Sequence, residues 1–291
     1  MREWPIGWRI SQRVVGSHSS SSVAGRCPAS SHSVDEPQAM RRPLVVANWK
    51  MHKTVRETVA YASELLALSG DLAGVDLLIA PPFTALAAAA TATRGTRIGV
   101  AAQDVSCERE GAFTGDVSAP MVREAGASHA IVGHSERRRG HGETDVVVQR
   151  KLQAARAAGL VPIVCVGETL DERDGGYTFD VIDRQLTVAL DGLTGDVVAA
   201  LVVAYEPVWA IGSGRVATTG EAEQVHAHLR GRLRQWCGGH AADNCRILYG
   251  GSVRPDNVID IIKLPDVDGA LVGGASLEVG GFVAIARGAQ R

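Results

Sequence analysis

Eight short apolar runs, each followed by a segment with helical periodicity, constrain the fold of this chain more than any other feature. Strictly alternating strands and helices form parallel sheets with right-handed crossovers. Eight such units in about 250 residues predict an α/β protein, a closed (β/α)8 barrel in a single domain. An open, doubly wound sheet is the alternative, but no G-x-G-x-x-G motif follows the first run. The predicted strands are Leu44–Asn48, Asp76–Ala80, Arg97–Ala102, His129–Gly133, Val161–Gly167, Ala200–Glu206, Arg246–Gly250 and Asp268–Gly273.

Several helix boundaries are marked by residues with a capping preference. Thr54-x-x-Glu57 and Thr218-x-x-Glu221 have the spacing of capping boxes. Gly159 is expected to end a helix, and Pro255 is expected to open one at its first turn. Two helices should each bury one face, formed by Val55, Val59, Ala62 and Leu66 in the first and by Ala222, Val225, Leu229, Leu233 and Trp236 in the other.

The composition gives no support to several classes of protein. The formal net charge of −2 gives no reason to expect a nucleic acid or a membrane as partner. No apolar run is long enough to span a bilayer. The five cysteines are scattered without metal-type spacing, which favours a reducing compartment over a disulfide framework and predicts no metal site.

Residues 1–40 differ from the rest of the sequence. They are rich in serine and arginine and contain too few aliphatic side chains to offset the entropy of ordering. We therefore expect a disordered or non-native extension over residues 1–40 and a barrel domain over residues 41–291. An over-extended reading frame with Met40 as the natural start is the favoured interpretation, and an organelle transit peptide is the alternative.

The end of the sixth predicted strand carries the first candidate site residue. Glu206 stands there, and Pro207 directly after it cannot continue the hydrogen-bond ladder. The apolar and then glycine-rich residues that follow predict a lid on a flexible hinge. A structural carboxylate followed by an ordinary surface loop is the alternative for this stretch considered alone. The predicted lid comprises Pro207, Val208, Trp209, Ala210, Ile211, Gly212, Ser213, Gly214 and Arg215.

Basic side chains follow the first and fourth predicted strands. Lys50 could supply a fixed positive charge to an anion, although lysines usually extend to solvent. His134 begins a helix, where the partial positive charge disfavours an imidazolium, so that a neutral ring could donate an N–H to a carbonyl oxygen. A histidine satisfied by its own loop is the alternative. The C-terminal ends of barrel strands lie on one face, and active sites are found on that face.

Small residues follow the seventh and eighth predicted strands. Gly250-Gly251-Ser252 and Gly273-Gly274 allow backbone N–H groups to approach a ligand closely. Their position after the last two strands of a barrel predicts an anion site, most naturally for phosphate. Cys165, at the end of the fifth strand, is interpreted as a packing residue beneath the site and not as a nucleophile.

Seven stretches of this sequence resemble triosephosphate isomerase, and the resemblance runs in unbroken order from about Arg41 to the C-terminus. It implies a TIM barrel and an isomerase of glycolysis and gluconeogenesis, which interconverts D-glyceraldehyde 3-phosphate and dihydroxyacetone phosphate through an enediol(ate). The stretches are Asn48-Trp49-Lys50-Met51, Gly111-Ala112-Phe113-Thr114-Gly115, Gly133-His134-Ser135-Glu136-Arg137-Arg138, Val164-Cys165-Val166-Gly167-Glu168, Ala204-Tyr205-Glu206-Pro207-Val208-Trp209-Ala210-Ile211-Gly212, Tyr249-Gly250-Gly251-Ser252 and Gly273-Gly274-Ala275-Ser276.

The resemblance also implies a role for each candidate residue. Glu206 would be the base that moves a proton between adjacent carbons, and His134 would polarise the substrate carbonyl. Lys50, with Asn48 beside it, would stabilise the negative charge of the substrate. Supporting residues around them would be Ser135, Glu136 and Cys165, and the residues that bind the phosphate would be Gly212, Ser252, Gly273 and Gly274.

Partners and location follow from the same resemblance. A homodimer is expected, because the loop that carries Phe113 and Thr114 inserts into a neighbouring subunit in this family, where Thr114 would brace Asn48 and Lys50. No cofactor or metal is expected, and the cytoplasm is the expected compartment. The sequence departs from the family pattern at a few positions: Ala47, Asp104, Asp116, Ser213 and Arg215.

Three other functions are known possibilities for a barrel of this kind. A Schiff-base aldolase would need a lysine near the centre of a strand, and the sixth strand carries Glu206 and no lysine. Another phosphosugar isomerase remains an alternative of the same class. A barrel that binds sugar phosphates without turnover would be expected to lack Glu206, His134 or Lys50, and all three are present.

Overall fold

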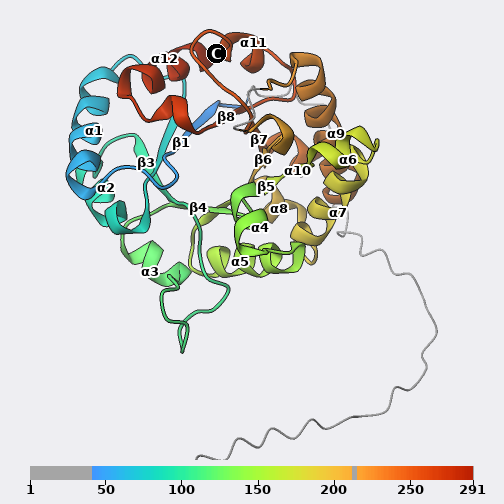
Figure 1. The fold of residues 1–291 in the computed structure, drawn as a ribbon, viewed down its shortest axis with the longest axis horizontal. Coiled ribbons are helices and arrows are strands. Elements are labelled where there is room, and N and C mark those ends of the chain that lie inside the picture. Colours follow the sequence, from blue (N-terminus) through green and yellow to red (C-terminus); the bar gives the residue numbers. More distant parts are fainter. Residues whose placement is uncertain (1–40, 212–214, 291) are drawn as a thin grey trace, which may run out of the picture.

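The eight predicted strands close into a barrel. The computed structural model describes residues 41–211 and 215–290, and its strands are all parallel and lie in sequence order around the barrel, with β8 paired to β1 (Figure 1). Leu44 pairs with Asp76 on one side and with Gly269 on the other. The barrel prediction is therefore confirmed. The strands are β1 (Leu44–Asn48), β2 (Asp76–Ala80), β3 (Ile98–Ala102), β4 (His129–Val132), β5 (Val161–Val166), β6 (Val202–Tyr205), β7 (Arg246–Tyr249) and β8 (Gly269–Val272).

Helices surround the strands as an outer ring (Figure 1). The α-helices are α1 (Val55–Leu68), α2 (Leu86–Ala92), α3 (Ala119–Glu124), α4 (Ser135–His141), α5 (Asp145–Ala157), α6 (Leu170–Asp174), α7 (Thr178–Leu190), α8 (Gly195–Ala199), α9 (Thr219–Cys237), α10 (Gly239–Asn244), α11 (Val258–Ile262) and α12 (Val279–Ala289). Three short 3₁₀ turns follow strands: η1 (Phe83–Ala85), η2 (Val208–Ala210) and η3 (Gly274–Ser276). Among the described residues, none of the helices combines the length and the apolar character needed to cross a membrane.

The strands are buried on both faces. In β1 every residue is buried: Leu44 and Val46 point into the barrel, whereas Val45 and Ala47 pack against the surrounding helices. A strand with two buried faces has no polar side, which explains why the sequence shows continuous apolar runs and no alternation.

The predicted buried face of α1 is wrong at two of its four residues, whereas Ala62 is buried and Leu66 is partly buried. The Thr54-x-x-Glu57 capping box begins the helix as expected, but Val55 and Val59 are 46% and 42% exposed. The buried residues are Thr58, Tyr61, Ala62 and Leu65. This stripe has helical spacing, but it includes Thr58 and Tyr61, whose polar side chains the apolar pattern did not select. The Tyr61 hydroxyl is buried at little cost because it donates to the Ser276 carbonyl over 2.8 Å.

Most of the other helix signals are confirmed. Gly159 lies beyond the end of α5 with a left-handed φ of +75°, and Thr218-x-x-Glu221 caps α9. On α9, Trp236 is only partly buried, although the other four predicted core residues are fully buried. Pro255 lies in a turn, and α11 begins only at Val258.

A buried ionic cluster closes the barrel at the N-terminal ends of the strands. Asp268, which precedes β8 and is fully buried, accepts hydrogen bonds from Arg230, from Arg41 Nε (2.6 Å) and from the backbone N–H of Ile247 (2.9 Å). Arg230 also donates to the carbonyls of Ala242 (2.7 Å) and Cys245 (2.6 Å). The carboxylate thus joins the start of the first strand to the last two strands.

Replacing Asp268 with alanine should strongly destabilise the barrel. The substitution removes the buried carboxylate shared by Arg230 and Arg41 and leaves Arg230 paired with Asp266 alone, and breaking a buried ion pair costs about 3–5 kcal/mol. Urea denaturation at fixed protein concentration measures the loss. Asp256→Ala is the matched control, since the Asp256 side chain is 70% exposed and its pair with Arg254 lies at the surface. Equal midpoints for the two variants would contradict the role given to Asp268.

Candidate active site

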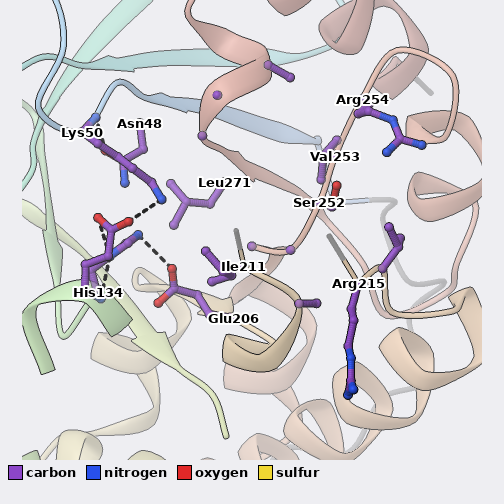
Figure 2. A pocket seen from close by; sticks show the side chains of 18 of the residues that line it. Asn48, Lys50, His134, Glu206, Ile211, Arg215, Ser252, Val253, Arg254 and Leu271 are labelled. Carbon is purple, nitrogen blue, oxygen red and sulfur yellow. Dashed lines mark hydrogen bonds and ion pairs between the residues drawn. The ribbon is translucent and has the colours of Figure 1, made fainter. Parts of the chain in front are cut away.

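A pocket of about 790 Å³ opens at the C-terminal ends of the strands. Figure 2 shows Lys50, Asn48, His134 and Glu206 on one side of it and Ser252, Val253 and Arg254 on the other. Most of the residues predicted from the strand ends therefore line one cavity. Those that line it are Asn48, Lys50, His134, Glu136, Glu206, Ala210, Ile211, Arg215, Ser252, Gly273 and Gly274.

Glu206 is held at the end of β6 by both its backbone and its side chain. Its backbone N–H donates to the Val166 carbonyl over 2.8 Å, which extends the pairing of β6 with β5. A Cβ at Gly167 would lie 1.8 Å from the Glu206 carbonyl oxygen, so only glycine allows this approach. The carboxylate is 2% exposed. It contacts His134 Nε2 through Oε1 (2.9 Å) and accepts the backbone N–H of Ser135 through Oε2 (2.8 Å).

The surroundings keep Glu206 ionised although it is buried. Burial alone raises the pKa of this carboxyl, but the charge and hydrogen bond of His134, the Ser135 N–H and the charge of Lys50 together lower it below its ordinary value. A carboxylate without water around it and with fixed donors at its oxygens is available as a base at neutral pH.

His134 caps the N-terminus of α4. Its Nδ1 accepts the backbone N–H of Glu136 over 3.2 Å, which leaves Nε2 as the protonated nitrogen facing Glu206. Burial lowers the pKa of His134, but the neighbouring Glu206 carboxylate outweighs burial, so the pKa lies above its ordinary value. The sequence prediction considered only the helix N-terminus and gave the opposite direction.

The main chain around Lys50 is held in a strained conformation. Lys50 has a left-handed φ of +53°. Its N–H donates to Asn48 Oδ1 (3.1 Å), and its carbonyl accepts from Gln103 Nε2 (2.8 Å), which also donates to the Ala80 carbonyl (2.7 Å). The ammonium pairs with Glu136 Oε1 at 2.6 Å. Sequence reasoning missed Gln103, although it directly follows the third predicted strand.

Glu168, at the end of β5, is a second residue that sequence reasoning missed. It is fully buried and accepts hydrogen bonds from the Tyr205 hydroxyl (3.1 Å), Trp209 Nε1 (2.8 Å) and Arg173 (3.1 Å). Trp209 belongs to the predicted lid, so this carboxylate anchors the lid's first half to β5 and β6. Its place in the Val164–Glu168 motif was the available signal.

The remaining predicted residues have different positions. Cys165 is fully buried, and burial raises the pKa of its thiol well above the ordinary value, which suits a packing residue. A Cβ at Gly273 would lie 3.4 Å from Lys50 Cε, so the glycine turn after β8 lies against the lysine stem. Phe113 and Thr114 are exposed on the β3–α3 loop, which projects away from the barrel (Figure 1). Gly212, Ser213 and Gly214 lie outside the described residues.

Two of the departures noted in the sequence, Asp104 and Asp116, have side-chain partners. Asp104 is buried and accepts from Lys151 Nζ (2.7 Å) and Arg137 Nε (2.9 Å). Asp116 accepts from the Ser106 hydroxyl over 2.8 Å. Over residues 41–211 and 215–290, no group of three or more His, Cys, Asp and Glu side chains is arranged to hold a metal ion.

Comparison with known proteins identifies similar chains over the whole barrel. The family model described as triosephosphate isomerase matches residues 43–289. The triosephosphate isomerase of Citrifermentans bemidjiense is 52% identical over 248 residues, which are 85% of this chain and 99% of that protein. The enzyme of the same name from Pelobacter propionicus is 50% identical over 243 residues, which are 84% of this chain and 97% of that protein. The crystal structure of triosephosphate isomerase from Bartonella henselae superimposes with a TM-score of 0.77 at 40% identity, over 85% of this chain and 98% of that one.

Removing the His134 ring should raise the pKa of Glu206. In His134→Leu, burial of the carboxyl remains while its main opposing cause is lost. Because the pKa of Glu206 is lowered in the wild type, its ionised carboxylate stabilises the fold above the unfolded-state pKa, and this stabilisation is lost as the pH falls. A raised pKa in the variant reverses the sign of this contribution to stability. Titration of 13C-labelled glutamate carboxyls by NMR measures the shift. His240→Leu, at an exposed histidine, is the control, and an unshifted Glu206 in His134→Leu would refute the assignment of cause.

Proposed function

The chain belongs to the triosephosphate isomerase family, and from this premise we propose how its residues carry out the reaction. It is an isomerase of glycolysis that interconverts D-glyceraldehyde 3-phosphate and dihydroxyacetone phosphate. The observation that supports the assignment of roles is the buried, ionised Glu206 opposite His134 and Lys50 in one pocket. The reversibility of the reaction also suits gluconeogenesis.

Glu206 is the base in this proposal. A proton on a carbon next to a carbonyl is weakly acidic, so its removal needs a base that is ionised and shielded from water. The carboxylate takes the proton from one substrate carbon and returns it to the adjacent carbon. The backbone N–H of Ser135 holds one oxygen in place while the other contacts His134 Nε2.

His134 supplies the hydrogen bond to the substrate oxygens and carries the hydroxyl proton of the enediol from one oxygen to the other. In the proposed complex, a substrate oxygen replaces Glu206 as the acceptor of the Nε2–H. The carboxylate that raises the pKa of His134 is then no longer its direct partner, and burial together with the bond to Nδ1 favours a neutral ring. A neutral donor already aimed at the developing oxyanion lowers the barrier without reorganisation.

Lys50 and the glycine turns hold the charged end of the substrate. We assign the phosphate to the backbone N–H groups of Gly273 and Gly274, to Ser252 and, on the lid, to Gly212. The contact of Gly273 with the Lys50 stem supports this assignment, because it brings an ammonium to the side of the turn. Asn48 contributes by fixing the backbone of Lys50.

The domain, assembly and compartment are further parts of the proposal. The catalytic domain spans residues 41–291, the extension expected over residues 1–40 lies outside the described residues, and the cytoplasm is the site of action. Two copies form a homodimer in which the projecting β3–α3 loop of each subunit reaches the β1–α1 loop of the other. Exposed apolar residues on both loops support this pairing: Phe113 is 47% exposed and Met51 is 93% exposed.

Shortening the base should abolish most of the turnover. Glu206→Asp withdraws the carboxylate by about 1 Å, which lowers kcat about 100-fold while KM changes little. A coupled NADH assay of glyceraldehyde 3-phosphate isomerisation, run with EDTA, measures both constants. Glu64→Asp, at an exposed position on α1, is the matched control. Unchanged kcat would rule out Glu206 as the base, and a wild type without turnover would favour a barrel that only binds sugar phosphates.

Placing a charge on the projecting loop should separate the subunits. Phe113→Asp would bury a carboxylate in the proposed interface, which shifts the sedimentation coefficient from that of a dimer to that of a monomer. The kcat should fall with it, because the β1–α1 loop that carries Lys50 loses its support. Tyr177→Asp, at another exposed aromatic residue (59% exposed), is the control. A wild type that sediments as a monomer would remove this part of the proposal.

A further inference from the structure

A buried layer of aromatic side chains lies behind the pocket, between the Lys50 loop and the glycine turn after β8. Trp49, the residue before Lys50, is fully buried, and its ring meets Tyr61 of α1 edge-on with centroids 4.7 Å apart. The Tyr61 hydroxyl reaches η3, the turn after β8, and donates to the Ser276 carbonyl over 2.8 Å. Tyr61 therefore contacts both the residue before Lys50 and the turn after β8, which are the two sides of the proposed anion site.

Ser276 in turn determines the position of the glycine turn. Its hydroxyl donates to the carbonyls of Val272 (3.0 Å) and Gly273 (2.7 Å), and its backbone N–H donates to Gly273 over 2.8 Å. Gly273 and Gly274 have no side chains to hold them; Ser276 holds the Gly273 carbonyl, and the Gly274 carbonyl accepts the backbone N–H of Leu277 over 3.1 Å. Ser276 itself is tied to the helix layer through Tyr61.

Lys53 holds the same aromatic pair from the side of the β1–α1 loop. Its ammonium lies 4.8 Å from the centroid of Tyr61 and 5.6 Å from that of Trp49. Lys53 has a left-handed φ of +72°, and Lys50 is the other non-glycine residue with positive φ in the described part of the chain. Both strained residues thus belong to the loop that packs on this layer.

We propose that Tyr61 is a positioning residue for the phosphate-binding turn. Its hydroxyl fixes Ser276, and through Ser276 the N–H groups of Gly273 and Gly274, at the level of the Lys50 ammonium. This inference rests on the proposed function, since it presupposes that these N–H groups bind the substrate phosphate. A purely structural role would require only that Tyr61 fill space between α1 and β8.

The ring and the hydroxyl of Tyr61 can be separated by experiment. Tyr61→Phe keeps the packing and removes one hydrogen bond, whose net contribution corresponds to about a fivefold change in an equilibrium constant. We expect the KM for glyceraldehyde 3-phosphate and the inhibition constant of inorganic phosphate to rise about fivefold, with kcat changed less than about twofold. Burial raises the pKa of Tyr61, so the hydroxyl remains a donor and the ratio of inhibition constants should not vary between pH 6 and 9.

Two further variants distinguish the possible causes. Thr93→Val removes a buried hydroxyl that donates to Ala89 on α2, far along the chain from the turn; it should lower the Tm without changing phosphate inhibition. Gly273→Ala places a methyl group against Lys50 Cε and should weaken phosphate inhibition directly.

The outcomes separate this inference from the proposed function. If Gly273→Ala weakens phosphate inhibition but Tyr61→Phe lowers only the Tm, Tyr61 has a packing role and the inference is wrong. If Gly273→Ala leaves phosphate inhibition unchanged, the proposed phosphate site is wrong and the role of Tyr61 falls with it. If both variants weaken phosphate inhibition while Thr93→Val does not, the positioning role is supported.

Discussion

The rest of this site depends on one constraint: the Glu206 carboxylate must stay ionised although it is buried. Burying such a charge is costly unless fixed donors face its oxygens. Here the donors come from the N-terminus of α4, which follows β4, two strands away around the barrel, and the missing side chain of Gly167 allows the β6 backbone to approach closely enough. The pairing of β5 with both β4 and β6 keeps these three segments in register.

The architecture could be predicted because it depends on local sequence patterns. Strands buried on both faces give continuous apolar runs, and helix caps have their own short motifs, so element types and most boundaries were correct. The strand ends then gave the candidate residues, because a parallel barrel brings every C-terminal end to one face. Where the prediction failed locally, at Val55 and Val59, the true core stripe includes Thr58 and Tyr61, which the apolar pattern did not select.

What could not be predicted depends on contacts between distant parts of the chain. Gln103 acts on the backbone of Lys50, and Glu168 collects donors from α6, β6 and the turn after it; neither contact has a signature in sequence spacing. The pKa direction of His134 failed for the same reason, since the dominant charge belongs to a residue 72 positions away in the sequence. Local sequence indicates which groups are present, whereas their electrostatics is a property of the assembled barrel.

The cluster around Asp268 has a practical consequence for attaching this protein to other molecules. Arg41 is bound to it at the N-terminal end of the strands, and Gln290, after α12, accepts the backbone N–H of Gly74, which precedes β2. Both ends of the described barrel are therefore anchored on the side opposite the pocket mouth. A fusion partner or a solid support joined beside either residue would leave the path of small molecules into the barrel open.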